Sequence, residues 1–201
     1  MIHLIFATFL EAKPFIKFYK LKRNMKINEF EIFINQRMKI SLTISGIGKL
    51  LSACAVVFTY SHFKKRNSIW INIGIAGVKD AELGKLFLID KINDTDNNTS
   101  FYPFCLFKTD IEKKDCKTFS EPNFEYTSSI HDMELSGFYL ASLKFSTNEL
   151  IHAFKIISDN KNEKINFKNV YDVANLMENN IKEIDKFIDK LSHMIQSHTN
   201  G

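Results

Sequence analysis

The chain has 201 residues, of which 45% are hydrophobic and 25% are charged, a composition typical of one soluble globular domain with a substantial core. Its formal net charge of +4 comes mainly from scattered lysines, since only three of the 27 basic residues are arginines. A nucleic-acid surface gathers its basic residues on one face and favours arginine, so we expect no nucleic-acid partner.

Cysteine and histidine usage predicts neither a disulfide scaffold nor a metal site. The three cysteines form no CxxC pair, and the six histidines are scattered without metal-ligand spacing. Cys54 lies within an apolar helical run and is expected in the core. The apolar run at residues 2–10 is too short to span a membrane, and no cleavage site of small residues follows it. These features predict a cytoplasmic protein without a membrane partner.

The N-terminal part predicts three strands and a helix. Residues 3–8 form an apolar run that fits a strand buried on both faces. Glu11 follows, and a helical pattern starts at Pro14, since proline is well tolerated in a first helical turn. A carboxylate at Glu11 either serves a site or is stabilised by the helix dipole. Residues 30–34 and 40–44 alternate in polarity and predict a hairpin.

Two glycine-containing segments follow strand-like runs. Residues 45–49, Ser-Gly-Ile-Gly-Lys, predict a flexible turn that opens a helix with apolar positions such as Leu50 and Val57. Residues 69–73 predict a buried strand. It runs into residues 74–77, Gly-Ile-Ala-Gly, which indicate a close backbone approach or a tight turn. Neither segment has the spacing of a P-loop or a dinucleotide-binding motif, so we expect no nucleotide cofactor.

The middle of the chain carries weaker signals. Residues 86–90 predict a further strand, and the polar residues 93–100 predict a mobile loop. Residues 101–107 are rich in aromatic side chains, and residues 108–124 show no clear period.

Two carboxylates fall at a predicted strand-to-helix junction. Alternating polarity at residues 126–130 gives way to helical spacing at residues 138–145. Asp132 and Glu134 lie between them, where open α/β folds bind ligands at the carboxyl edge of the sheet. In the alternative interpretation, Asp132 caps the helix and Glu134 interacts favourably with its dipole.

The C-terminal part predicts a strand and a long helix. Residues 153–157 form an apolar run that ends directly in Ser158 and Asp159. Residues 173–195 carry an apolar stripe at helical spacing, which belongs either to the core or to a subunit contact. Helical and strand patterns interleave without a linker. We therefore predict a single α/β domain over residues 1–201, with a central mixed sheet.

Five of these segments, in their order, resemble the purine nucleoside phosphorylase and nucleosidase superfamily, and most closely its methylthioadenosine/S-adenosylhomocysteine nucleosidase branch. The matching segments are the N-terminal strand with Glu11, residues 45–49, residues 72–77, Asp132-Met133-Glu134 and Ile157-Ser158-Asp159. The resemblance runs from residue 2 to about residue 195. It implies a three-layer α/β/α sandwich of the nucleoside phosphorylase type that needs no metal or cofactor. It also implies a homodimer whose partner contributes aromatic residues to the pocket. Phe101 and Tyr102 are candidates, and packing in an exposed loop is the equal alternative for both.

The resemblance further implies a role for each of three carboxylates. Cleavage of a purine N-glycosidic bond leaves positive charge on the ribose and negative charge on the base. The reaction therefore needs a general acid, an activated water and a grip on the sugar. By resemblance, Asp159 protonates purine N7, Glu11 activates the water, and Glu134 accepts hydrogen bonds from the ribose hydroxyls. Asp159 would need a pKa raised by burial to hold a proton near neutral pH. The other residues that the resemblance places in the substrate site are Ile47, Ala76, Gly77, Met133, Ser158 and Phe167.

Hydrolysis is favoured over phosphorolysis. The family's phosphorylases cradle phosphate with arginines, and Asn72 stands where one of them would be. The carboxylate of Glu11 would also repel phosphate. We therefore predict a purine nucleosidase that acts on methylthioadenosine, S-adenosylhomocysteine or a related nucleoside. A phosphate-dependent phosphorylase is the alternative enzyme.

Among the departures from the family pattern, two bear on activity. Ile75 stands where the family has a small polar residue. The segment of residues 108–132 is shorter than in the family, which leaves Phe119 and Phe124 as candidates for the phenylalanine that stacks on the base. These departures keep a further possibility open, a catalytically inactive nucleoside-binding protein.

Overall fold

The computed structural model describes residues 1–163, 165 and 170–199, in which strands and helices are interleaved along the chain as predicted. The strands are β1 (Ile2–Phe6), β2 (Lys22–Arg23), β3 (Glu31–Asn35), β4 (Ile40–Ile44), β5 (Ile69–Gly77), β6 (Leu86–Asp94), β7 (Thr99–Phe101), β8 (Lys113–Thr118), β9 (Ile130–Asp132) and β10 (Ile151–Asp159). The helices are α1 (Phe9–Phe18), α2 (Lys49–Phe63), α3 (Leu135–Ser142) and α4 (Val170–Thr199), with a 3-10 turn at Asn148–Leu150.

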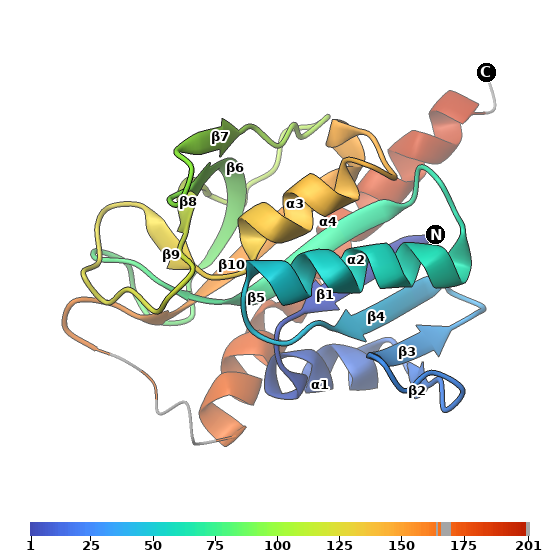
Figure 1. Ribbon diagram of the computed structural model, residues 1–201, viewed down its shortest axis with the longest axis horizontal. Helices are drawn as coiled ribbons and strands as arrows, with labels where there is room; N and C mark the ends of the chain where they lie inside the picture. The colour runs from blue at the N-terminus through green and yellow to red at the C-terminus, as the bar shows by residue number, and fades with distance from the viewer. Residues whose placement is uncertain (164, 166–169, 200–201) are drawn as a thin grey trace.

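Helices cover both faces of the sheet, and the predicted three-layer α/β/α sandwich is confirmed (Figure 1). Helices α2 and α3 lie side by side on one face, and α1 and α4 cover the other. Each pair closes its own apolar core, one with Phe15 and Met177 and the other with Val56 and Phe138. Hydrophobic burial on both faces therefore explains why the central strands are continuous apolar runs.

The centre of the sheet is parallel. Strand β1 pairs in parallel with both β4 and β5, and β5 pairs in parallel with β10. The carboxyl ends of these strands therefore meet at one edge, and Asp159 lies opposite Gly77. Strand β9 joins this edge because His131 pairs with Gly77 in the antiparallel sense.

Strands β5 and β10 of the parallel centre also belong to a closed ring of five strands. In the described part of the chain, the sheet has ten strands, and its order runs from β10 through β6, β8 and β9 to β5. Because β10 also pairs with β5, this end of the sheet curls back on itself. The sequence does not predict β8, since its side chains are mostly lysine, aspartate and threonine and only Cys116 and Thr118 are buried.

Two local predictions are wrong. Residues 93–100 do not form a long loop, because β6 continues to Asp94 and pairs with β7 from Thr99 onward. Helix α1 starts at Phe9 instead of Pro14, with Thr8 as its N-cap, so the proline lies inside the helix. The capping interactions of Thr8, described below, determine this earlier start.

Helix α2 exists as predicted, but the apolar positions on which the prediction rests do not face the core. The side chains that face the core are small or β-branched, namely Ser52, Ala55, Val56 and Thr59. Leu50 and Val57 are 79% and 47% exposed, and Cys54, predicted to be in the core, is exposed as well. An apolar stripe of α2 therefore faces outward.

The long C-terminal helix is confirmed as α4. Its apolar positions Val173, Met177, Ile184 and Leu191 are buried against α1 and the sheet, so this stripe belongs to the core. No helix among the described residues is long and apolar enough to cross a membrane.

Gly137 allows α2 and α3 to touch, and its substitution gives a stability prediction. A Cβ atom added at Gly137 would lie 2.9 Å from Cα of Lys49 and nearer still to the carbonyl of that residue. Because backbone cannot move aside cheaply, we expect Gly137→Ala to lower the free energy of unfolding by about 1–3 kcal/mol. Urea denaturation measures this change. Leu143→Ala, at an exposed position beside the same helix, should cost much less, and equal losses would contradict the packing argument.

Candidate functional site

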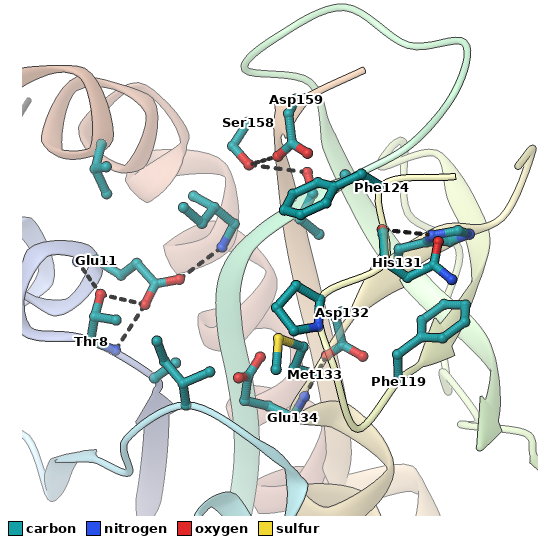
Figure 2. A pocket seen from close by; sticks show the side chains of 18 of the residues that line it. Thr8, Glu11, Phe119, Phe124, His131, Asp132, Met133, Glu134, Ser158 and Asp159 are labelled. Atoms are coloured by element: carbon teal, nitrogen blue, oxygen red, sulfur yellow. Dashed lines mark hydrogen bonds between the residues drawn. The ribbon is translucent and has the colours of Figure 1, made fainter. Parts of the chain in front are cut away.

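A cavity of about 400 Å³ opens at the carboxyl edge of the sheet, where β1, β5, β9 and β10 end. Figure 2 shows Glu11, Glu134 and Asp159 approaching it from three sides. The residues that line it are Ala7, Thr8, Leu10, Glu11, Ile47, Ile75, Ala76, Gly77, Phe119, Pro122, Asn123, Phe124, Tyr126, His131, Asp132, Met133, Glu134, Ser158, Asp159 and Val173.

Glu11 is both a helix cap and a cavity residue. Its Oε2 accepts hydrogen bonds from the backbone N–H of Thr8 at 2.8 Å and from Thr8 Oγ1 at 2.6 Å, which completes a capping box. Its Oε1 accepts the backbone N–H of Ile75 at 2.9 Å. Three donors therefore hold this buried carboxylate in one orientation at the cavity wall.

The glycines of residues 74–77 provide close approach, not a turn. The segment is the last part of β5, so the alternative of a tight turn is wrong. A Cβ atom on Gly74 would lie 3.1 Å from Glu11 Oε1. A Cβ atom on Gly77 would lie 2.7 Å from Asp159 Oδ2 and closer still to the ring of Tyr126. Side chains at these positions would fill the space that the two carboxylates use.

Asp159 is the last residue of β10. A register shift between Ile157 and Asp159 interrupts the pairing with β5, and such irregularities re-aim the side chain that follows. Ser158 Oγ lies 2.5 Å from Asp159 Oδ1 and 3.3 Å from the carbonyl oxygen of Ala76. The Asp159 carbonyl accepts the backbone N–H of Val78 at 3.0 Å. Strand pairing and the serine hydroxyl thus position this carboxylate.

Glu134 lies between β9 and α3, next to Met133 at the cavity. Its Oε1 accepts the backbone N–H of Gly48, the N-cap of α2, at 2.8 Å. Burial raises the pKa of Glu134 from its ordinary 4.5 to about 7; the charge of Asp132 acts in the same direction, and Lys155 opposes it. This carboxylate therefore titrates much closer to neutral pH than an ordinary glutamate does.

Asp132 is not the N-cap of α3, which is Glu134, but its carboxylate accepts N–H groups at the start of this helix. Its Oδ2 accepts the backbone N–H groups of Leu135 at 2.9 Å and Glu134 at 3.3 Å. The same oxygen lies 2.7 Å from Nζ of Lys155, a residue that the sequence analysis does not single out. The sequence feature that could have identified Lys155 is that it is a lysine in the otherwise apolar run of residues 153–157.

Aromatic side chains form the wall opposite Glu11. Phe119 and Phe124 both line the cavity, and Phe124 is 71% exposed (Figure 2). Tyr126 lines it from a loop, because the predicted strand at residues 126–130 starts only at Ile130. Burial lowers the pKa of His131, whose ring packs against that of Phe119 in a tilted arrangement.

The remaining predicted residues fall in three places. Ile47, Ala76 and Gly77 line the cavity with Met133 and Ser158. Phe101 and Tyr102 are not among the described lining residues: Phe101 packs against Tyr139, and Tyr102 is exposed. Phe167 lies outside the described residues.

Positively charged side chains are absent from the described cavity lining. Arg23, Arg37 and Arg66 are exposed. Asn72 is buried within β5, where its amide donates to the carbonyl of Ile5 at 3.3 Å. Among the residues that the structure describes, no group of three or more His, Cys, Asp and Glu side chains is arranged to hold a metal ion.

Comparisons with known proteins extend this description. No protein-family model and no curated protein matches the sequence. A 5′-methylthioadenosine/S-adenosylhomocysteine nucleosidase from Campylobacter jejuni is 16% identical with a TM-score of 0.73, over 94% of this chain and 98% of that chain. A 5′-methylthioadenosine nucleosidase from Arabidopsis thaliana is 13% identical with a TM-score of 0.77, over 94% and 95%. A futalosine hydrolase mutant from Helicobacter pylori is 13% identical with a TM-score of 0.67, over 94% and 98%. Across nearly its whole length, the chain therefore has the fold of the methylthioadenosine/S-adenosylhomocysteine nucleosidases.

Proposed function

We propose that the chain is a purine nucleosidase that hydrolyses the N-glycosidic bond. The observation that carries this proposal is the placement of Glu11, Glu134 and Asp159 around one cavity in the fold of known nucleosidases. Fold alone does not determine activity, so the argument rests on these three carboxylates.

Each carboxylate suits one demand of the reaction. Asp159, beside the Ser158 hydroxyl, donates a proton to N7 of the departing purine. Glu11 keeps a fixed orientation through three donors and orients the attacking water. Glu134 uses Oε1 for Gly48 and has no donor to Oε2 among the described residues, so Oε2 accepts hydrogen bonds from the ribose 2′ and 3′ hydroxyls.

Water is the proposed nucleophile. A phosphorylase needs positive charge to cradle phosphate, whereas the described lining contains carboxylates and no arginine or lysine. Hydrolysis without phosphate is therefore favoured over phosphorolysis.

Methylthioadenosine and S-adenosylhomocysteine are the proposed substrates. Leu10, Ile47 and Val173 add apolar surface to the cavity, which suits a thioether at the 5′ position.

Ile75 supports the second candidate, an inactive nucleoside-binding protein. It presents an apolar side chain beside Glu11, where the resembling family has a polar one.

We also propose a cytoplasmic homodimer formed through α2 and α3. The outward stripe of Leu50, Cys54 and Val57 lies on α2, and Leu140 of the neighbouring helix α3 is exposed as well. Ile47 lies just before α2, is 58% exposed and lines the cavity, so this surface is continuous with the cavity mouth. A second copy would bury the stripe and close the mouth. The cysteines are free thiols, which agrees with a reducing compartment.

Chromatographic detection of free base tests the proposed activity. Methylthioadenosine, S-adenosylhomocysteine, adenosine, inosine and guanosine are incubated with the protein, with and without phosphate. We expect adenine release without phosphate. Asp159→Asn should lower kcat at least about 100-fold while the protein remains folded, because it removes the acid. Release only with phosphate would establish a phosphorylase. Thermal stabilisation by a nucleoside without any release would establish a binding protein.

The pH dependence tests the role of Glu134. Because its pKa is raised to about 7 and the ionised form accepts the ribose hydroxyls, kcat/KM should rise about tenfold between pH 6 and 8. Glu134→Gln should remove this rise.

The folded pKa lies above the ordinary 4.5, so Glu134 contributes stability below pH 4.5 that is lost as pH rises through about 7. The melting temperature of Glu134→Gln, measured relative to that of the wild type, should therefore increase as the pH is raised from 5 to 8. A constant difference would contradict the raised pKa.

Sedimentation equilibrium tests the dimer. The wild type should sediment as a dimer, and Leu50→Lys with Val57→Lys should produce monomers, because two charges would have to be buried. Met25→Lys is the matched control, since Met25 is 75% exposed and lies in the loop between β2 and β3, outside the proposed interface. A monomeric wild type, or a double variant that remains dimeric, would exclude this interface.

A further inference from the structure

A lysine is buried beneath the cavity without lining it. Lys155 lies in β10 and is 1% exposed, and the carboxylate of its partner Asp132 is fully buried at the ion-pair distance of 2.7 Å. Replacing such a pair by apolar side chains is often neutral or stabilising, whereas removing one partner costs several kcal/mol. Stability alone therefore does not explain why a lysine stands at this position.

The partner of Lys155 holds the segment that carries Glu134. Asp132 accepts the backbone N–H groups of Glu134 and Leu135 through the same oxygen that pairs with Lys155. Its other oxygen accepts the hydroxyl of Thr118 at 2.8 Å. Thr118 Oγ1 in turn accepts the backbone N–H of Ser136 at 3.1 Å. The ion pair thus links β10 to the first turn of α3.

Lys155 also lies close to two carboxylates of the site, those of Glu134 and Glu11. Four groups surround the carboxylate of Glu134. Asp132 belongs to the same segment and Glu11 to α1, while Lys155 belongs to β10 and the N–H of Gly48 lies at the start of α2. A Cβ atom on Gly74 would lie 3.6 Å from Lys155 Nζ and 3.1 Å from Glu11 Oε1, so the ammonium and that carboxylate both lie next to Gly74. The buried thiol of Cys116, on β8, faces the same pair.

We propose that Lys155 is a positioning residue of the site: through Asp132 it fixes the main chain that carries Glu134, and its charge balances the clustered carboxylates without contact with the nucleoside. The substrate-related part of this inference rests on the proposed nucleosidase function. Burial by itself would lower the pKa of Lys155, but the charges of Asp132 and Glu134 raise it above its ordinary value, so the side chain remains an ammonium.

Lysine variants test the proposal with a readout that needs no activity. The titration of Glu134 is followed by ¹³C NMR of glutamate-labelled protein, with the signal assigned through Glu134→Gln. In Lys155→Met, the midpoint of this titration should move upward by about one pH unit or more, because an opposing positive charge is lost. Lys155→Arg should restore it. Lys144→Met, at an exposed lysine just after α3, should leave it unchanged.

The pH profile of kcat/KM provides the second readout. In Lys155→Met, the rise near pH 7 should move upward with the NMR midpoint, and kcat/KM at pH 7 should fall at least about fivefold. Unchanged NMR and kinetic midpoints in folded Lys155→Met would overturn the proposal. A wild type that releases no base would overturn the nucleosidase function, while the NMR midpoint would still decide the effect of Lys155 on Glu134.

A double variant covers the case in which Lys155→Met does not fold. Lys155→Met with Asp132→Asn leaves no unpaired buried charge, so it should fold near the wild-type melting temperature. Its kcat/KM should still fall at least about tenfold, because the fixed link between β10 and α3 is lost. Wild-type kcat/KM in this folded double variant would overturn the positioning role.

Discussion

Parallel pairing of β5 with both β1 and β10 is the constraint on which the rest of the structure depends. It brings the carboxyl ends of three strands to one edge, so that residues more than 140 positions apart in sequence meet at a single cavity. The pairing of β9 with the end of β5 adds the segment of Glu134 to the same edge. Helices pack on both faces and leave this edge open, which is where α/β sheets bind ligands.

Buried carboxylates at such an edge need donors, and main-chain N–H groups supply several of them. Thr8 and Ile75 donate to Glu11, and Gly48 donates to Glu134. These donors are part of the fold and require no rearrangement when a ligand enters, which is the condition for preorganised electrostatic stabilisation. The remaining imbalance of negative charge gives the buried ammonium of Lys155 its importance.

The loop that carries Phe124 and the outward face of α2 both lie near the entrance to the cavity. Phe124 is largely exposed although it lines the cavity, so it has few contacts that hold it in one position. Ile47 connects the cavity with the apolar stripe on α2. Substrate entry and the proposed subunit contact therefore involve neighbouring surfaces.

Local pattern was sufficient for the fold class, for the long runs that became β1, β5, β10 and α4, and for locating Glu11, Glu134 and Asp159 at element ends. These features depend on periodicity and on short-range chemistry, which the chain carries at each position. Polar β8, the outward face of α2 and the pairing of Lys155 with Asp132 could not be read in this way. Each depends on the parts of the chain that lie opposite in space. Polar β8 forms because it completes the closed ring of strands, and α2 keeps an outward face because α3 covers only part of it. A lysine in an apolar strand is stable because a carboxylate from another segment faces it.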